Sequence, residues 1–131
     1  TWDVGLCCQV LEHLPFDRLG PALRELHRVT ARGLVLSLPD VTMDLELTVR
    51  VPRLGLRRLA GRSPLPRRRA FPSTRLETMG HHWEIGFRGT PLTAVQSVIA
   101  VAGWRIERTW RVPEVPWHRF FVLRHAERPD H

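Results

Sequence analysis

The chain has 131 residues, which is enough for one compact domain and too few for two of ordinary size. Its content of 43% hydrophobic and 25% charged residues is typical of globular proteins and excludes disordered and fibrous classes. The formal net charge of +7 arises in one segment, because all 20 basic residues are Arg and nine of them lie between Leu47 and Leu76, where Asp and Glu are absent.

The first third of the chain predicts a strand, a helix and a second strand. Asp3 to Val10 is continuously apolar, which is typical of a strand covered on both faces in a parallel sheet. A helix is expected from an N-cap at Asp17 to about Arg28. Gly33 is expected to interrupt regular structure before a second buried strand over Leu34–Leu38. A strand, a helix and a strand at this spacing predict a βαβ unit.

Two cysteines are adjacent in the first predicted strand. Neighbouring strand residues point to opposite faces, so a disulfide between Cys7 and Cys8 would be strained. We therefore expect two buried free thiols, which fit a reducing, cytoplasmic location. No apolar run approaches the roughly 18 residues of a membrane span, so a soluble protein is expected. Because the chain starts with Thr1 in a strand-like run, we also expect it to start within a domain.

Residues 41–80 are less regular and predict an Arg/Pro-rich insertion or cap within the domain. Pro52 interrupts any helix there, and Ser63–Ser73 predicts a loop. Regular patterning returns with a helix that Thr90 caps, that has Pro91 at its first position, and that Gly103 ends.

The last two predicted strands differ in their patterns. Trp104–Val112 alternates, with Trp104, Ile106, Trp110 and Val112 on one face, which is typical of a half-exposed strand at a sheet edge. Residues 120–123 are apolar without interruption, as expected of a strand covered on both faces. These patterns predict that the final strand inserts between the edge strand and the rest of the sheet.

The segment from Trp2 to Asp40 resembles class I S-adenosylmethionine-dependent methyltransferases, from their fourth strand to their fifth. The resemblance rests on VLEHL after the first strand, on ALRELHRV in the helix, and on a second strand that ends in Pro39. The later segments HHWEIGFRGTPL and PEVPWHRFFVLRH resemble the tail of uncharacterised bacterial and archaeal members. The resemblance implies an α/β fold, a partial Rossmann-like sheet with strands 4, 5, 7 and 6 in that order, an antiparallel last strand and flanking helices.

A glycine-rich turn after the first strand of that family lies close to the cofactor, and this sequence has no Gly-x-Gly. We therefore expect residues 1–131 to be the C-terminal part of one methyltransferase domain. The implied activity is methyl transfer from S-adenosylmethionine to a small or lipid-linked acceptor, with no cofactor binding by residues 1–131 alone. An open sheet edge at Val4–Val10 is expected to make this part poorly soluble. The alternative is a non-catalytic relic that binds an anionic partner.

The resemblance also implies site residues at the carboxyl end of the first strand. Cys8, Gln9 and Val10 are expected to border the methionine part of the cofactor, and the alternative for Cys8 and Val10 is core packing. His13, which follows the strand end, is the candidate to orient or deprotonate an acceptor. The alternative for His13 is a helix-entry residue hydrogen-bonded to the backbone.

A metal is not expected at this point of the chain. In related small-RNA 2′-O-methyltransferases a Glu-x-x-Glu-His arrangement binds a divalent ion here, but Gln9 replaces the first Glu and lacks its charge. His81 and His82 are adjacent and do not have zinc-ligand spacing.

His82, Trp83 and Glu84 precede the third predicted helix and are candidates for acceptor binding, with Trp83 as an aromatic wall. The alternative is a packed turn that Trp83 anchors. For the Arg-rich segment, a solvated loop ranks first, contact with an anionic acceptor or membrane surface second, and nucleic acid last, because only Phe71 interleaves with the arginines. The sequence indicates no oligomeric state.

Overall fold

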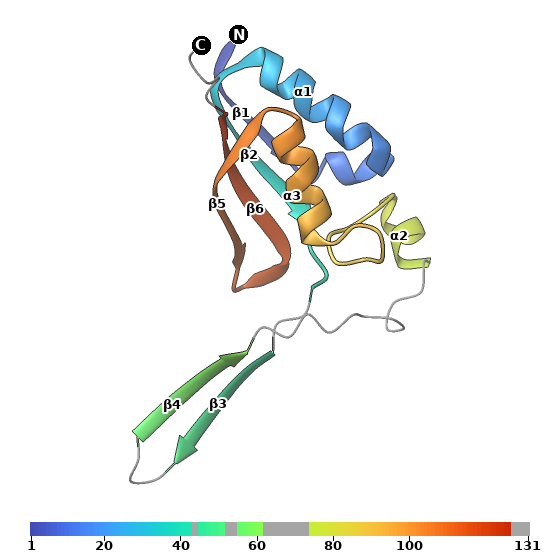
Figure 1. Cartoon of the computed structure of the whole chain (residues 1–131). Helices are drawn as coiled ribbons and strands as arrows, with labels where there is room; N and C mark the ends of the chain where they lie inside the picture. The colour runs from blue at the N-terminus through green and yellow to red at the C-terminus, as the bar shows by residue number, and fades with distance from the viewer. Residues whose placement is uncertain (43–44, 52–54, 62–73, 127–131) are drawn as a thin grey trace.

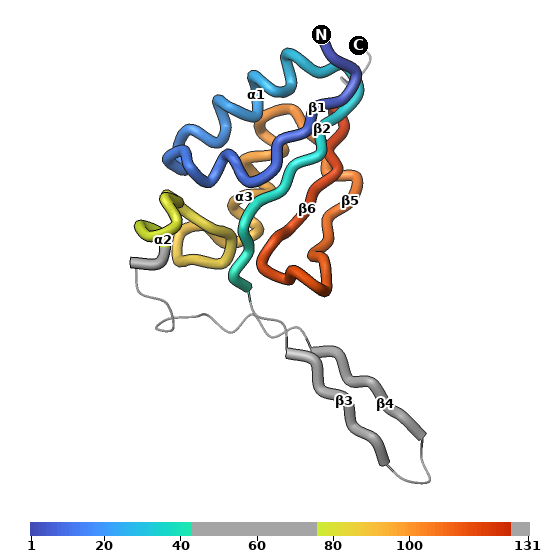
Figure 2. The backbone as a smooth tube through the Cα atoms, turned by 180° about the vertical axis from the view of Figure 1, so that it is seen from behind, coloured from blue at the N-terminus to red at the C-terminus, as the bar shows by residue number. Residues whose placement is uncertain are grey.

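The computed structural model describes the backbone of residues 1–42, 45–51, 55–61 and 74–126, and the side chains of residues 1–42 and 76–126. The fold is of the α/β class and contains a four-stranded mixed sheet with the order β1-β2-β6-β5 (Figures 1 and 2). The strands of this sheet are β1 (Trp2–Cys8), β2 (Thr30–Pro39), β6 (Val115–His125) and β5 (Trp104–Val112). The helical elements are η1 (Leu11–His13), η2 (Phe16–Arg18), α1 (Leu19–Val29), α2 (Thr74–Met79) and α3 (Leu92–Val101).

The predicted strand–helix–strand unit is confirmed, because β1 and β2 pair in parallel and α1 connects them. Two details of the prediction were wrong. Asp17 lies within the short turn η2 and its side chain makes no capping hydrogen bond, so α1 begins at Leu19. Gly33 does not break the chain but lies inside β2, where a Cβ atom would stand 2.6 Å from the backbone oxygen of Leu123 on β6. The glycine there permits close strand pairing.

The predicted positions of the last two strands are also confirmed. β6 lies between β2 and β5 and runs antiparallel to both, and β5 is the edge strand. The predicted facing of β5 was wrong at Trp110. A register shift between Ile106 and Arg108 reverses the alternation, so Trp110 pairs with Phe120 and stacks on its ring with centroids 5.5 Å apart. A β-bulge of this kind cannot be read from a period of two.

The hydrophobic core lies between the sheet and the helices on one of its faces. α1 and α3 contact each other and cover this face (Figure 1). Alternate residues of β2 and β6 point into the core and are buried, including Leu34, Leu36, Leu38, Phe121 and Leu123. The indole of Trp104 is buried with them and donates a hydrogen bond of 3.0 Å to the Leu23 carbonyl of α1. The start of β5 is thereby fixed to the first helix.

α3 begins at Leu92, one residue later than predicted, and Pro91 takes the cap position. The hydroxyl of Thr90 is buried and donates to the Glu84 carbonyl at 2.7 Å rather than capping the helix. Gly103 follows the helix with a φ of +92°, which confirms the predicted helix end.

The opposite face of β1 is exposed, although a strand covered on both faces was predicted. Trp2 is 76% exposed and Leu6 is 75% exposed, and Val4 between them is also exposed. Cys7 points into the core, but Cys8 points to the open face and is exposed, so the prediction of two buried thiols was wrong for Cys8. The expected open edge at Val4–Val10 is confirmed, because β1 pairs only with β2 within the described sheet.

Residues 41–80 contain an antiparallel pair of strands, β3 (Leu45–Val51) and β4 (Gly55–Gly61), which the sequence pattern did not predict. The loop predicted for Ser63–Ser73 lies outside the described residues. Among the helices of the described residues, none has the length and apolarity needed to span a bilayer.

Candidate functional site

The predicted cofactor-contacting residues lie at the carboxyl end of β1. Cys8 and Val10 are exposed, so the core-packing alternative for these two residues does not hold. Gln9 has a φ of +54° and is the only described residue other than glycine with positive φ. Its backbone N–H donates to the Ser37 carbonyl at 3.1 Å, and its side-chain amide donates to the Ser37 hydroxyl at 3.1 Å. The strand end is therefore fixed to β2 while its neighbours remain open to solvent.

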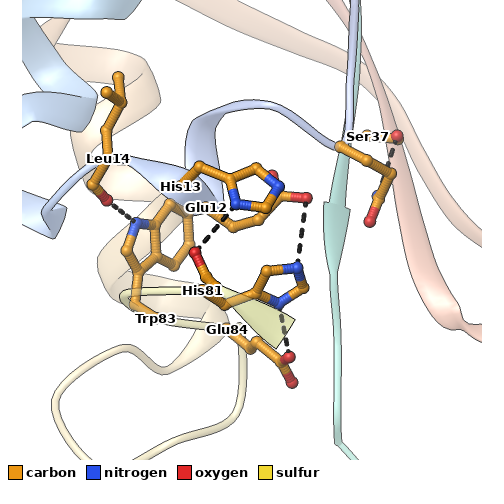
Figure 3. Close-up of polar contacts among 9 residues, drawn as sticks. Glu12, His13, Leu14, Ser37, His81, Trp83 and Glu84 are labelled. Atoms are coloured by element: carbon orange, nitrogen blue, oxygen red, sulfur yellow. Dashed lines mark hydrogen bonds and ion pairs between the residues drawn. The ribbon is translucent and has the colours of Figure 1, made fainter. Parts of the chain in front are cut away.

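The segment after α2 lies beside this strand end, although it is remote in the sequence. Ile85 donates from its backbone to the Pro39 carbonyl at 2.9 Å and accepts from the Val41 N–H at 2.9 Å, which extends β2 by a parallel bridge. The His82 N–H donates to the Glu12 carbonyl at 2.8 Å. These backbone contacts bring residues 81–84 next to η1, as Figure 3 shows.

Glu12 is the most unusual residue of this region. Its side chain is 0% exposed, and no hydrogen-bond donor of the described residues reaches either carboxylate oxygen. Nε2 of His81 lies 4.0 Å from Oε1 (Figure 3). A buried carboxylate without a partner costs several kcal/mol in general, and such groups in native proteins are typical of catalytic sites and of sites for a water or an ion.

Two imidazole rings adjoin the carboxylate. The rings of His13 and His81 have centroids 5.0 Å apart, and ligand atoms of Glu12, His13 and His81 all lie within 4.8 Å of one another. Nδ1 of His13 is 2.9 Å from the Gly80 carbonyl, and Nδ1 of His81 is 2.8 Å from a Glu84 carboxylate oxygen. Because both partners accept, both Nδ1 atoms carry the proton, and a neutral ring therefore has its lone pair on Nε2.

The predicted acceptor-binding residues have different environments. Trp83 is 3% exposed, contacts the ring of Phe16 and donates to the Leu14 carbonyl at 3.1 Å, which matches the packed-turn alternative. Glu84 is buried and orients His81, whereas the side chain of His82 is exposed. Of the three predicted residues, Glu84 contacts the cluster of Glu12, His13 and His81 through its side chain, and His82 contacts it through its backbone N–H.

The environment of His13 matches its alternative, and its role toward an acceptor stays a prediction. Its ring is hydrogen-bonded to the backbone through Nδ1, and the residue is exposed, which leaves Nε2 open to a ligand. His81 was not a candidate in the sequence, because no local spacing relates it to Glu12. The one available signal was its place in the segment expected to form the acceptor pocket.

Burial raises the pKa of the Cys7 thiol, and the neighbouring Cys8 and Glu12 add to this increase. Cys7 is therefore an unreactive core thiol near neutral pH. On the far side of β2, Arg119 donates to the buried carboxylate of Asp40 at 2.6 Å, and Asp40 also accepts from the Thr42 N–H. This ion pair fixes the end of β2 to β6.

The side chains of the Arg-rich segment lie outside the described residues, apart from Leu76 at its end. The chain matches no model of a known protein family, and no curated protein sequence is significantly similar to it.

Proposed function

We propose that this chain is the C-terminal half of a class I S-adenosylmethionine-dependent methyltransferase and carries the acceptor side of its cleft. The observation that carries the proposal is the strand order β1-β2-β6-β5 with an antiparallel β6. It equals the order 4, 5, 7, 6 that the resemblance of Trp2–Asp40 implies, and β6 was placed by apolar pattern alone. The substrate proposed is a small or lipid-linked metabolite.

The open edge of the sheet supports the proposal that the domain has further strands beside β1. Within the part of the chain that the structure describes, no strand pairs with the outer side of β1, and the exposed side chains of Trp2, Val4 and Leu6 form an apolar row on the uncovered face. A soluble domain rarely leaves such an edge open. Further strands beside β1, with helices on the uncovered face, would cover both and would supply the glycine-rich turn that residues 1–131 lack.

The strand ends fit the methionine part of the cofactor. In open α/β sheets, ligands bind beyond the carboxyl ends of parallel strands, where Cys8, Gln9 and Val10 lie. The exposure of Cys8 and Val10 and the fixed turn at Gln9 leave this edge accessible. When bound, S-adenosylmethionine supplies an electrophilic methyl group, and the protein has only to hold an acceptor in line and exclude water.

His13 is the residue of this chain that meets the acceptor. The Gly80 carbonyl holds its Nδ1 proton, so the exposed Nε2 can orient an acceptor hydroxyl or take its proton. The carboxylate of Glu12 and the ring of His81 lie next to the His13 ring, with ligand atoms of the three residues within 4.8 Å of one another. The buried Trp83 fixes the loop on which His81 stands.

The proposal is tested first in the coding sequence upstream of Thr1, which should encode, in frame, a strand that ends in Gly-x-Gly. The polypeptide that includes this strand should transfer labelled methyl groups to an acceptor in a metabolite extract. Within it, Cys8→Trp should weaken cofactor binding at least tenfold by filling the strand end, while Val101→Trp on the exposed side of α3 should not. Equal binding by the two variants would place the cofactor elsewhere and contradict the proposal.

A further inference from the structure

Two hydrogen-bond acceptors face each other in the interior beside η1. Oε1 of Glu12 and Nε2 of His81 are 4.0 Å apart, and in a neutral His81 ring Nε2 has the lone pair because Nδ1 donates to Glu84. Two such atoms repel unless a positively charged group or a donor lies between them. Among the described residues, no hydrogen-bond donor reaches either oxygen of Glu12.

We infer that Glu12, His13 and His81 bind one divalent transition-metal ion. In a tetrahedral site the ligand atoms lie about 2.0–2.2 Å from such an ion and about 3.4 Å from one another. Oε1 of Glu12 and Nε2 of His81 are 4.0 Å apart, and ligand atoms of the three residues lie within 4.8 Å of one another. Bonding distance therefore requires these atoms to close by about 0.6–1.4 Å, with the exposed His13 moving most.

Both imidazoles are already fixed in the form that binds a metal. Metal-bound histidines commonly donate their second ring N–H to a carbonyl or a carboxylate, which sets the tautomer and the ring orientation. The Gly80 carbonyl does this for His13 at 2.9 Å, and Glu84 does it for His81 at 2.8 Å. These contacts hold Nε2 of each ring as the ligand atom without any contribution from an ion.

The donor set selects the class of ion. Two imidazole nitrogens and one carboxylate suit Zn²⁺, Co²⁺ or Mn²⁺, whereas Mg²⁺ and Ca²⁺ take oxygen ligands almost exclusively. Gln9 is not part of the set, because its amide donates to Ser37. The site therefore differs from the Glu-x-x-Glu-His arrangement considered from the sequence, in that His81 from a remote loop supplies the third ligand.

The site is open on one side. Glu12 is buried and the side chain of His81 is 9% exposed, but His13 is exposed and provides the entry path. Three protein ligands leave at least one coordination position free, as in catalytic metal sites. An acceptor oxygen bound to the ion would lose its proton more readily. The ion would then activate the acceptor hydroxyl in place of His13. Metal binding itself needs no cofactor and is independent of the proposed methyl transfer.

The test is a titration of the full chain with Co²⁺ in visible absorption, without a polyhistidine tag and with Cys8→Ser to remove the exposed thiol. We expect one equivalent to bind with a saturable spectrum. Glu12→Gln and His81→Gln should each weaken binding at least tenfold. His82→Gln is the matched control, because it removes the adjacent exposed histidine, and it should bind as the parent does. Circular dichroism checks that each variant is folded.

Three results would overturn the inference. The first is the absence of saturable binding at millimolar Co²⁺ by the folded chain. The second is unchanged affinity in Glu12→Gln, which keeps the shape of the side chain and is the variant least disruptive to folding. The third is a thiolate charge-transfer band, which would place the ion at Cys7. Each result concerns the metal alone, so methyl transfer by a longer polypeptide could still be found.

Discussion

Glu12→Gln should stabilise the protein when no metal is present. The substitution keeps the volume of a fully buried side chain and removes its charge. A buried polar group without a partner costs about 1–3 kcal/mol, and more when it is charged. The new amide can also donate to Nε2 of His81, which lies 4.0 Å from the present Oε1. We therefore expect the free energy of unfolding to rise by about 1–3 kcal/mol, which corresponds to several degrees in Tm for a domain of this size.

Thermal and urea unfolding in a chelator measure this change. The control is Glu25→Gln, because Glu25 lies on the exposed side of α1 in an exposed pair with Arg28, so its loss should change stability by about 0.5 kcal/mol or less. With saturating Co²⁺ the order should reverse, because the ion stabilises only the protein that binds it. A Glu12→Gln variant that is less stable than the parent in chelator would show that the carboxylate has a partner, and would refute the reasoning.

Three further predictions concern the fold. Gly33→Ala should lower the free energy of unfolding by about 1–3 kcal/mol in urea unfolding, because its Cβ would overlap a backbone oxygen of β6 at 2.6 Å; an unchanged midpoint would contradict this. Arg119→Met should cost about 3–5 kcal/mol by leaving the buried Asp40 unpaired, whereas Arg124→Met, in a half-exposed pair, should cost under about 1 kcal/mol. Because burial raises the pKa of Cys7, the unfolded thiol ionises before the folded one, and stability should fall as the pH rises above about 8.5. Cys7→Ala should remove this fall, and a persistent fall would assign it to another group.

Sequence patterns predicted the layers of this fold because burial leaves a periodic trace along the chain. The sequence shows in this way the helix of α1, the continuous apolar run in β6 and the helix end at Gly103. The bulge in β5 was not visible, since it depends on pairing with β6. Gly33 was interpreted as an interruption of regular structure. Its role is to let the backbone of β6 approach closely, and a sequence pattern does not show which segments pair.

At the candidate site, sequence patterns show even less of which residues lie together in space. His13 could be selected because it follows a strand end, where ligands of α/β proteins bind. His81 could not, because only backbone hydrogen bonds around Ile85 bring its loop to η1. Trp83 was a candidate for acceptor binding, but it is buried and donates to the Leu14 carbonyl. Thr90 was expected to cap a helix, but it is buried and donates to the Glu84 carbonyl. Contacts between residues far apart in the sequence determine which of these side chains belong to the candidate site.

The measurement that tests the central claim most directly is a calorimetric titration with S-adenosylmethionine. It compares residues 1–131 alone with the polypeptide extended upstream to the strand that ends in Gly-x-Gly. We expect no heat of binding for residues 1–131, whose β1 edge is open, and stoichiometric binding by the longer polypeptide. Clean binding by residues 1–131, or no binding by the folded longer polypeptide, would contradict this expectation.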